Sequence, residues 1–272
     1  MEKADKQKTL IGGIVLILII AGLAIWYMAT NPPKPIPFGQ VQEPSQEVPE
    51  GAFRKELTVD EGQYHTAVAA YPAETPLRDT AGAEADAAVV ASLKSFGEEE
   101  IAAFKENSGL ASLTQEDIEM LGFDQGRKYA LEMDFEVSES PKTLTYVYTI
   151  YADTLGAHPN GYYRTFTFDK ATGEEISLND LFIGGYLQRL SEVSRQMLPG
   201  FISAKTGYEA NMESIEIGTT ANIENFQNFA LQGDNLVLIF PPYQVGPYAI
   251  GPQFLEIPLT EISDVLSPAY RP

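Results

Sequence analysis

The sequence predicts an α+β fold in which helices pack on an antiparallel sheet. Two periodicities predict it: apolar residues at every second position, typical of half-buried strands, and apolar residues three or four apart, typical of helices. The clearest strand is YALEMDFEV, residues 129–137, and the clearest helix is residues 83–109. The helix has an apolar stripe that needs a sheet to cover it. That stripe consists of Val90, Leu93, Ile101 and Phe104.

Three more segments before residue 170 have strand character. GQYHTAVAAYP, residues 62–72, is a strand that Pro72 ends, because proline cannot donate to a sheet. After YALEMDFEV, the segment SESPK turns the chain and TLTYVYTIY, residues 143–151, returns it. YYRTFTFD, residues 162–169, adds a third strand, so we expect an antiparallel meander.

Capping and turn residues mark shorter elements. Thr114, followed three residues later by Asp117, is a capping-box pattern for a short helix that Gly122 can close. Gly173 supplies a positive φ for the turn DKATGEE. A second amphipathic helix is expected over residues 185–198, ended by the Pro-Gly pair that follows.

The C-terminal part is expected to contribute a hairpin, a further strand and a short helix. NFALQGDNLVLIF, residues 228–240, is a hairpin that turns at Gly233 and Asp234. Its second arm is apolar at every position, which predicts a central strand covered on both faces. FLEIPL, residues 254–259, adds a strand, and a short helix is expected over residues 260–266.

A membrane anchor is predicted before the folded part. Residues 10–29 carry no charge and, as a helix, span the ~30 Å hydrocarbon core, with Trp26 and Tyr27 at one interface. The apolar run is longer than that of a cleaved signal peptide, so an uncleaved anchor is the better interpretation. Lysines gather before the span, which puts the N-terminus in the cytoplasm and the rest outside. Six prolines in residues 31–50 predict an extended spacer.

The expected organisation has five parts. They are a cytoplasmic tail (1–9), a transmembrane anchor (10–30), a Pro-rich linker (31–52), a small N-terminal α/β subdomain (53–124) and a C-terminal α+β domain (125–272).

Charge and cysteine content exclude several classes of protein. The chain has 18 Lys and Arg against 38 Asp and Glu, a formal net charge of −20, which argues against nucleic-acid binding. Such acidity either keeps the surface solvated or attracts a cationic partner. The chain has no cysteine, which excludes disulfides, thiolate nucleophiles and cysteine-bound zinc.

Catalytic patterns are sparse. The chain has two histidines, His65 and His158, and neither a G-x-S-x-G nor an H-E-x-x-H motif, so no metal or other cofactor is expected. A pair of carboxylates would suffice for glycoside hydrolysis, and the sequence singles out no such pair. We interpret His65 as a partly exposed strand residue.

Two loops hold the candidate ligand-binding residues. His158 either contacts a ligand or holds a turn through backbone hydrogen bonds, with Asn160 and the next glycine supplying the reversal. Four prolines stiffen residues 241–252, so Tyr243 and Tyr248 are either rigid contact residues or rings packed on their own domain. The candidate ligand-binding residues are Tyr243, Tyr248, Gly251, His158 and Asn160.

Three motifs taken together carry a family resemblance. They are GAHPN at residues 156–160, LNDLF at 178–182, and the pattern P-Y-x-x-x-P-Y-x-x-G at 242–251. With these motifs the chain resembles the extracytoplasmic domain shared by the lysozyme-sensing anti-sigma factor RsiV and the non-catalytic N-terminal region of the peptidoglycan deacetylase PdaC. The resemblance runs from about residue 62 to 266 and implies an α+β module outside the membrane, which in one member binds lysozyme.

The resemblance gives the expected function. Only nine residues precede the predicted span, too few to hold a sigma factor, and the chain ends where a deacetylase domain would begin. We therefore expect no enzyme, but a single-pass extracytoplasmic binding or sensing module of the bacterial cell envelope. A basic protein such as lysozyme, and peptidoglycan, are its candidate ligands. The alternatives are a carboxylate-dependent envelope hydrolase and a structural scaffold of an envelope complex.

Overall fold

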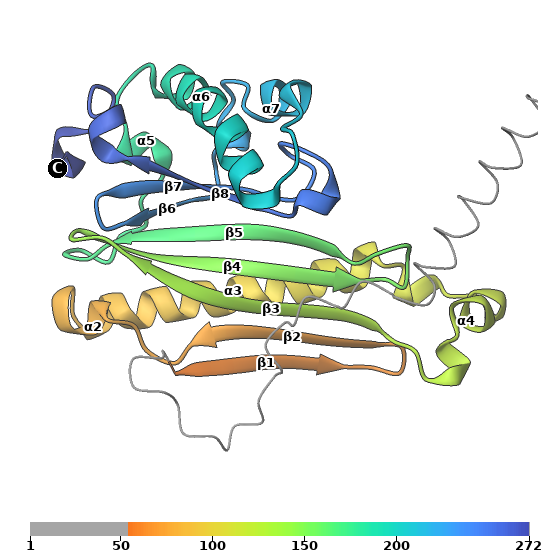
Figure 1. Ribbon diagram of the computed structural model, residues 1–272. Coiled ribbons are helices and arrows are strands. Elements are labelled where there is room, and N and C mark those ends of the chain that lie inside the picture. The colour runs from red at the N-terminus through yellow and green to blue at the C-terminus, as the bar shows by residue number, and fades with distance from the viewer. Residues whose placement is uncertain (1–53, 272) are drawn as a thin grey trace, which may run out of the picture. The chain divides into compact units, whose positions relative to one another are not determined.

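The computed structural model describes residues 54–271, which form two sheets with helices on their outer faces (Figure 1). The strands are β1 Lys55–Glu61, β2 His65–Pro72, β3 Tyr129–Glu139, β4 Thr143–Asp153, β5 Asn160–Asp169, β6 Phe229–Gln232, β7 Asn235–Phe240 and β8 Gln253–Pro258. The α-helices are α2 Leu77–Thr80, α3 Ala83–Asn107, α4 Gln115–Leu121, α5 Leu178–Leu181, α6 Tyr186–Thr206 and α7 Met212–Gly218. The short 3-10 helices are Leu110–Ser112, Phe123–Gln125, Ile223–Asn225, Tyr248–Ile250, Leu259–Ile262 and Pro268–Tyr270.

The larger sheet has the strand order β1-β2-β3-β4-β5. The meander of β3, β4 and β5 is antiparallel, as the alternating pattern predicts. The pairing of β2 with β3 is parallel, so the prediction of an antiparallel sheet was wrong at this point. Parallel neighbours need a long crossover between them, and residues 73–128, which contain α3, provide it. The sheet is therefore mixed, within an α+β fold.

Helix α3 covers one face of this sheet. Its buried residues include Val89, Leu93, Ile101 and Phe104, close to the predicted stripe. Gly97 lets the helix approach β2, because a Cβ at this position would lie 2.9 Å from that of Ala69. The helix needs this close approach to bury its stripe. The short helix α4 has the predicted capping box, closed by a left-handed glycine.

The second sheet, of order β6-β7-β8, packs on the other face of the first. Val147 of β4 forms a buried cluster with Ala230, Val237 and Ile239 between the two sheets. The alternate residues of β7 face α6 and belong to the largest core cluster. Strand β7 is central and covered on both faces, as its continuous apolar run predicts.

The helix expected at residues 185–198 is longer than predicted. Helix α6 continues through Pro199 to Thr206, although an internal proline costs about 3 kcal/mol. Leu198 and Ile202, on either side of Pro199, are fully buried in the core, and their burial offsets that cost. Strand β1 and helix α7 were not predicted. The helix expected at 260–266 is reduced to the 3-10 turn Leu259–Ile262.

The N-terminal predictions are not described by this structure. Residues 1–9, 10–30 and 31–52 lie outside the described residues. Within residues 54–271, no helix is both long enough and apolar enough to cross a bilayer. The boundary expected between residues 53–124 and 125–272 falls between β2 and β3 in the chain, and these strands pair in one continuous sheet.

Candidate functional site

Three of the five candidate residues meet on the surface. His158, in the loop between β4 and β5, stacks on Tyr248 with ring centroids 4.4 Å apart and an interplanar angle of 25°. Its Nε2 lies 3.1 Å from the hydroxyl of Tyr243, and the two tyrosine rings are 5.4 Å apart. Both tyrosines come from the loop between β7 and β8. We call His158, Tyr243 and Tyr248 the ring cluster.

The hydrogen bonds of His158 set the orientation of its ring. Nδ1 lies 2.9 Å from the carbonyl oxygen of Pro159, which only accepts, so Nδ1 carries the hydrogen. In the neutral ring, Nε2 then accepts from the Tyr243 hydroxyl. His158 thus makes the backbone bond expected of a structural residue and also contacts both tyrosines.

The backbone is strained in both loops of the ring cluster. Among the described residues, Tyr243 and Leu155 are the non-glycine residues with positive φ, at 74° and 58°. This left-handed conformation costs an L-residue about 1–2 kcal/mol. Asp153 supports the first loop by accepting a hydrogen bond from the Leu155 amide. Strain of this kind persists where the surrounding structure fixes it, often at binding sites.

The tyrosines remain open to solvent although they pack on the domain. Tyr243 is 60% exposed and Tyr248 is 38% exposed. The rings therefore pack locally, as one of the two alternatives predicts, and are also exposed. Their contact with a ligand, the other alternative, stays a prediction. Exposed rings held in fixed positions lose little conformational entropy when a ligand covers them.

The other two candidate residues have different positions. Asn160 is an exposed residue at the start of β5, in register with Ala152, so it is part of a strand and not of a reversal. The predicted Asn-Gly turn was wrong, because the reversal occurs earlier, around Leu155. Gly251 has φ 66° and ψ −170°, a conformation open almost only to glycine, and its carbonyl accepts from buried Gln253. Gly251 shapes the loop that holds the tyrosines.

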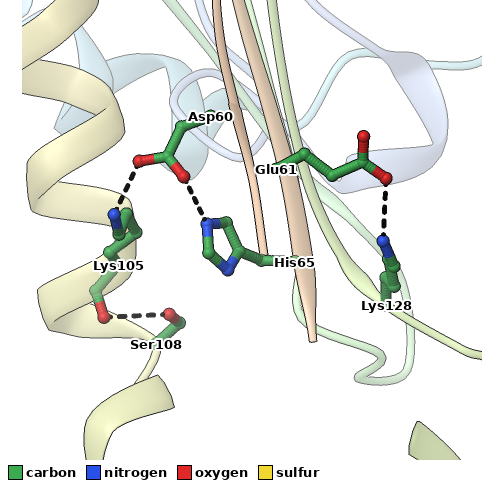
Figure 2. Close-up of polar contacts among 6 residues, drawn as sticks. All are labelled: Asp60, Glu61, His65, Lys105, Ser108 and Lys128. Atoms are coloured by element: carbon green, nitrogen blue, oxygen red, sulfur yellow. Dashed lines mark hydrogen bonds and ion pairs between the residues drawn. The ribbon is translucent and has the colours of Figure 1, made fainter. Parts of the chain in front are cut away.

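A second cluster, which the sequence did not predict, lies between β1 and α3 (Figure 2). One carboxylate oxygen of Asp60 is 2.6 Å from Lys105 Nζ, and the other is 2.9 Å from His65 Nε2. These bonds, that of Lys105 first, hold the pKa of Asp60 below its usual value. His65 is thus a paired residue. Ser108 lies beside this cluster but does not bond to His65. Its hydroxyl donates to the backbone carbonyl of Lys105 at 3.3 Å.

An open pocket adjoins this cluster, with a volume of about 440 Å³. We call it the β1–α3 groove. It is lined by Thr58, Val59, Asp60, Glu61, Glu98, Ile101, Ala102 and Lys105. Its sequence signal was weak because four of the seven residues of β1 are charged. Within the described part of the chain, no group of three His, Cys, Asp or Glu could hold a metal ion.

Known proteins support the family resemblance. Residues 179–260 match the family model described as Protein of unknown function (DUF3298). The chain is 26% identical over 181 residues to the peptidoglycan-N-acetylmuramic acid deacetylase PdaC of Bacillus subtilis, a match that covers 65% of this chain and 36% of PdaC. It is 27% identical over 122 residues to an esterase of Mycobacterium tuberculosis, covering 44% of this chain and 51% of that protein.

A solved structure of a DUF3298 family member from Bacteroides fragilis is similar in fold. It has a TM-score of 0.51 and 18% sequence identity, and the match covers 79% of this chain and 93% of that one. The predicted resemblance to a domain of unknown function shared with PdaC is confirmed. The matched segment spans about a third of PdaC and half of the esterase, so their activities do not transfer directly to this chain.

Proposed function

We propose that the chain is a non-enzymatic, extracytoplasmic binding module of the bacterial cell envelope. The ring cluster is the observation that carries this proposal. It presents two exposed tyrosines on strained but well-packed loops, and tyrosine is enriched among residues that dominate binding energy. The similarity to PdaC, whose name refers to peptidoglycan, supports an envelope location.

The acidity of the domain favours a cationic ligand. Residues 54–271 contain 14 Lys and Arg against 33 Asp and Glu, a formal net charge of −19. Such a field raises the association rate of a basic protein and opposes an anionic wall polymer. A basic muramidase of the lysozyme type is therefore the preferred ligand, with peptidoglycan second.

Calorimetric titration of the full 272-residue chain in detergent, with a cationic lysozyme and with soluble peptidoglycan fragments, tests the proposal. We expect saturable lysozyme binding that weakens as salt rises. The double variant Tyr243→Ala/Tyr248→Ala should lose at least about tenfold in affinity. Tyr208→Ala, which truncates another exposed tyrosine, is the matched control. Failure of both ligands to bind at low salt would overturn the proposal.

The location has its own test. We infer that the N-terminal segment is an uncleaved anchor and that the acidic domain faces outward. A protease added to intact cells should then degrade the domain while the cytoplasm stays sealed. A domain that is digested only after cell lysis would place it inside.

A hydrolase is the second candidate, favoured by the pairing of Asp60 with His65 and by the esterase among the relatives. Its test is turnover of ester substrates or of wall glycan by the full chain. Turnover that His65→Ala or Asp60→Asn abolishes would promote the hydrolase over the binding module.

A further inference from the structure

Among residues 54–271, no strand pairs with the outer edge of β1. Strand β1 is the first strand in the order β1-β2-β3-β4-β5 and pairs with β2 on one side (Figure 1). The outward N–H and C=O groups of an edge strand are a template for a further strand. The ring cluster draws His158 from the loop before β5, the strand at the opposite edge, so the two regions are separate.

The β1–α3 groove lies along this edge. Thr58 and Asp60 line it from β1, and Glu98, Ile101 and Ala102 line it from α3. Ile101 is buried and gives the groove an apolar base. Side chains of a strand alternate between faces, so every second residue of an added strand would point toward the helix side of the sheet and into the groove.

Charge indicates which side chains fit there. On the helix side, the carboxylates of Asp60 and Glu98 lie against one cation, Lys105, which is already bonded to Asp60. Glu61 also lines the groove, but its carboxylate is bonded to Lys128. Glu98 is joined only by a long, exposed contact of 3.9 Å to Lys94. The groove therefore favours a basic side chain.

The other face of β1 is apolar. Leu57 and Val59 are 44% and 57% exposed, and they project on the side away from α3. An added strand would cover them with its alternate residues. The matching occupant is an extended segment in which basic residues alternate with apolar ones.

Two occupants from this chain fit less well. Residues 31–50 contain six prolines, which have no N–H to donate to a sheet, and three glutamates, which have the same charge sign as the groove. In a second copy paired antiparallel about Thr58, Glu56 would lie opposite Asp60 on the groove face. Like charges directly opposite destabilise a strand pair, and each copy of the chain carries a formal net charge of −20.

We propose that β1 and the β1–α3 groove bind an extended segment of a partner protein as a sixth strand, with alternating basic and apolar residues. This site goes beyond the proposed function, since it shares no residue with the ring cluster.

Fluorescence anisotropy with a labelled peptide of about eight residues, alternating Lys and Val, tests this site on the full chain. A peptide of the same composition, with the lysines in one block and the valines in another, controls for charge alone. We expect the alternating peptide to bind at least about tenfold more tightly. Equal affinity of the two peptides would overturn the proposal.

Three variants and one further measurement make the test specific. Glu98→Lys, and Ala102→Trp, which fills the groove, should each weaken alternating-peptide binding about tenfold, whereas Glu116→Lys on α4 changes charge equally and should leave it within about twofold. Hydrogen exchange should show β1 amides protected when the peptide binds. Unchanged affinity in both groove variants, or unprotected β1 amides, would contradict strand addition.

Two outcomes separate this site from its alternatives. The double variant Tyr243→Ala/Tyr248→Ala should leave peptide binding unchanged, because the two sites share no residue. Failure of lysozyme to bind therefore tests the ring cluster alone, and failure of the peptide to bind tests the β1–α3 groove alone. Dimerisation of the full chain with β1 protected in the absence of peptide would overturn the proposal in favour of a second copy.

Discussion

The ring cluster and the β1–α3 groove place side chains on the surface in different ways. The ring cluster uses two irregular loops, each with a non-glycine residue at positive φ. The groove uses a regular strand, β1, and a regular helix, α3, which packs closely on the neighbouring strand β2 at Gly97. Strained loops fix a few rings, whereas regular elements offer backbone groups at an even spacing. The first region suits a folded surface and the second suits an extended segment.

The largest expected effect is a loss of stability at the contact between helix α3 and strand β2, next to the groove. Gly97→Leu would place a side chain where even a Cβ comes within 2.9 Å of Ala69. We expect a loss of about 3 kcal/mol in the free energy of unfolding, measured by urea titration. Gly156→Leu, in the loop of His158 where a Cβ meets nothing within 4 Å, should change stability by less than about 0.5 kcal/mol. Equal losses of stability in Gly97→Leu and Gly156→Leu would show that the packing of α3 on the sheet is no tighter than that of the His158 loop.

Backbone strain at Tyr243 predicts a smaller effect on stability. Here glycine is expected to stabilise the fold relative to alanine, because it relieves the strain. Tyr243→Gly removes the ring and the left-handed penalty together, whereas Tyr243→Ala removes only the ring. We expect the glycine variant to be about 1 kcal/mol more stable than the alanine variant. The same pair at Tyr208, which has no positive φ, should show no such advantage. If alanine at 243 is as stable as glycine, the loop is not strained as described.

The smallest effect concerns pH and Asp60. Lys105 and His65 hold the pKa of Asp60 below its usual value in the folded state. The stability from this carboxylate is therefore present above its unfolded pKa, near 3.8, and is lost as pH falls through the lower folded pKa. Urea midpoints of the full chain and Asp60→Asn should differ at pH 7 and converge in acid. A gap between the two midpoints that widens in acid would have the wrong sign and would contradict this account of Asp60.

Local patterns predicted much of the fold. The alternation in β3, the capping box of Thr114 and Asp117, and the continuous apolar run of β7 each depend on residues close in sequence. The parallel pairing of β2 with β3 depends on how the crossover through α3 packs, which no local pattern records. Helix α6 passes Pro199 because distant core residues bury its second half.

Local sequence patterns also fail to predict which residues of the candidate sites come together. His158, Tyr243 and Tyr248 were singled out one by one, but their contact joins residues 85 positions apart and appears only in the fold. The bond between Asp60 and Lys105 spans 45 positions. Without β1 in the predicted sheet, neither the edge nor the groove followed from the sequence.

The central claim is that the ring cluster, and not β1, is the envelope-binding surface. Hydrogen exchange of the full chain with and without saturating cationic lysozyme tests this claim most directly. We expect new protection in residues 154–159 and 241–252, which contain the ring cluster, and none in β1. Protection of β1 with the two loops unchanged, or no protection anywhere, would contradict the assignment of the ring cluster as the envelope-binding surface.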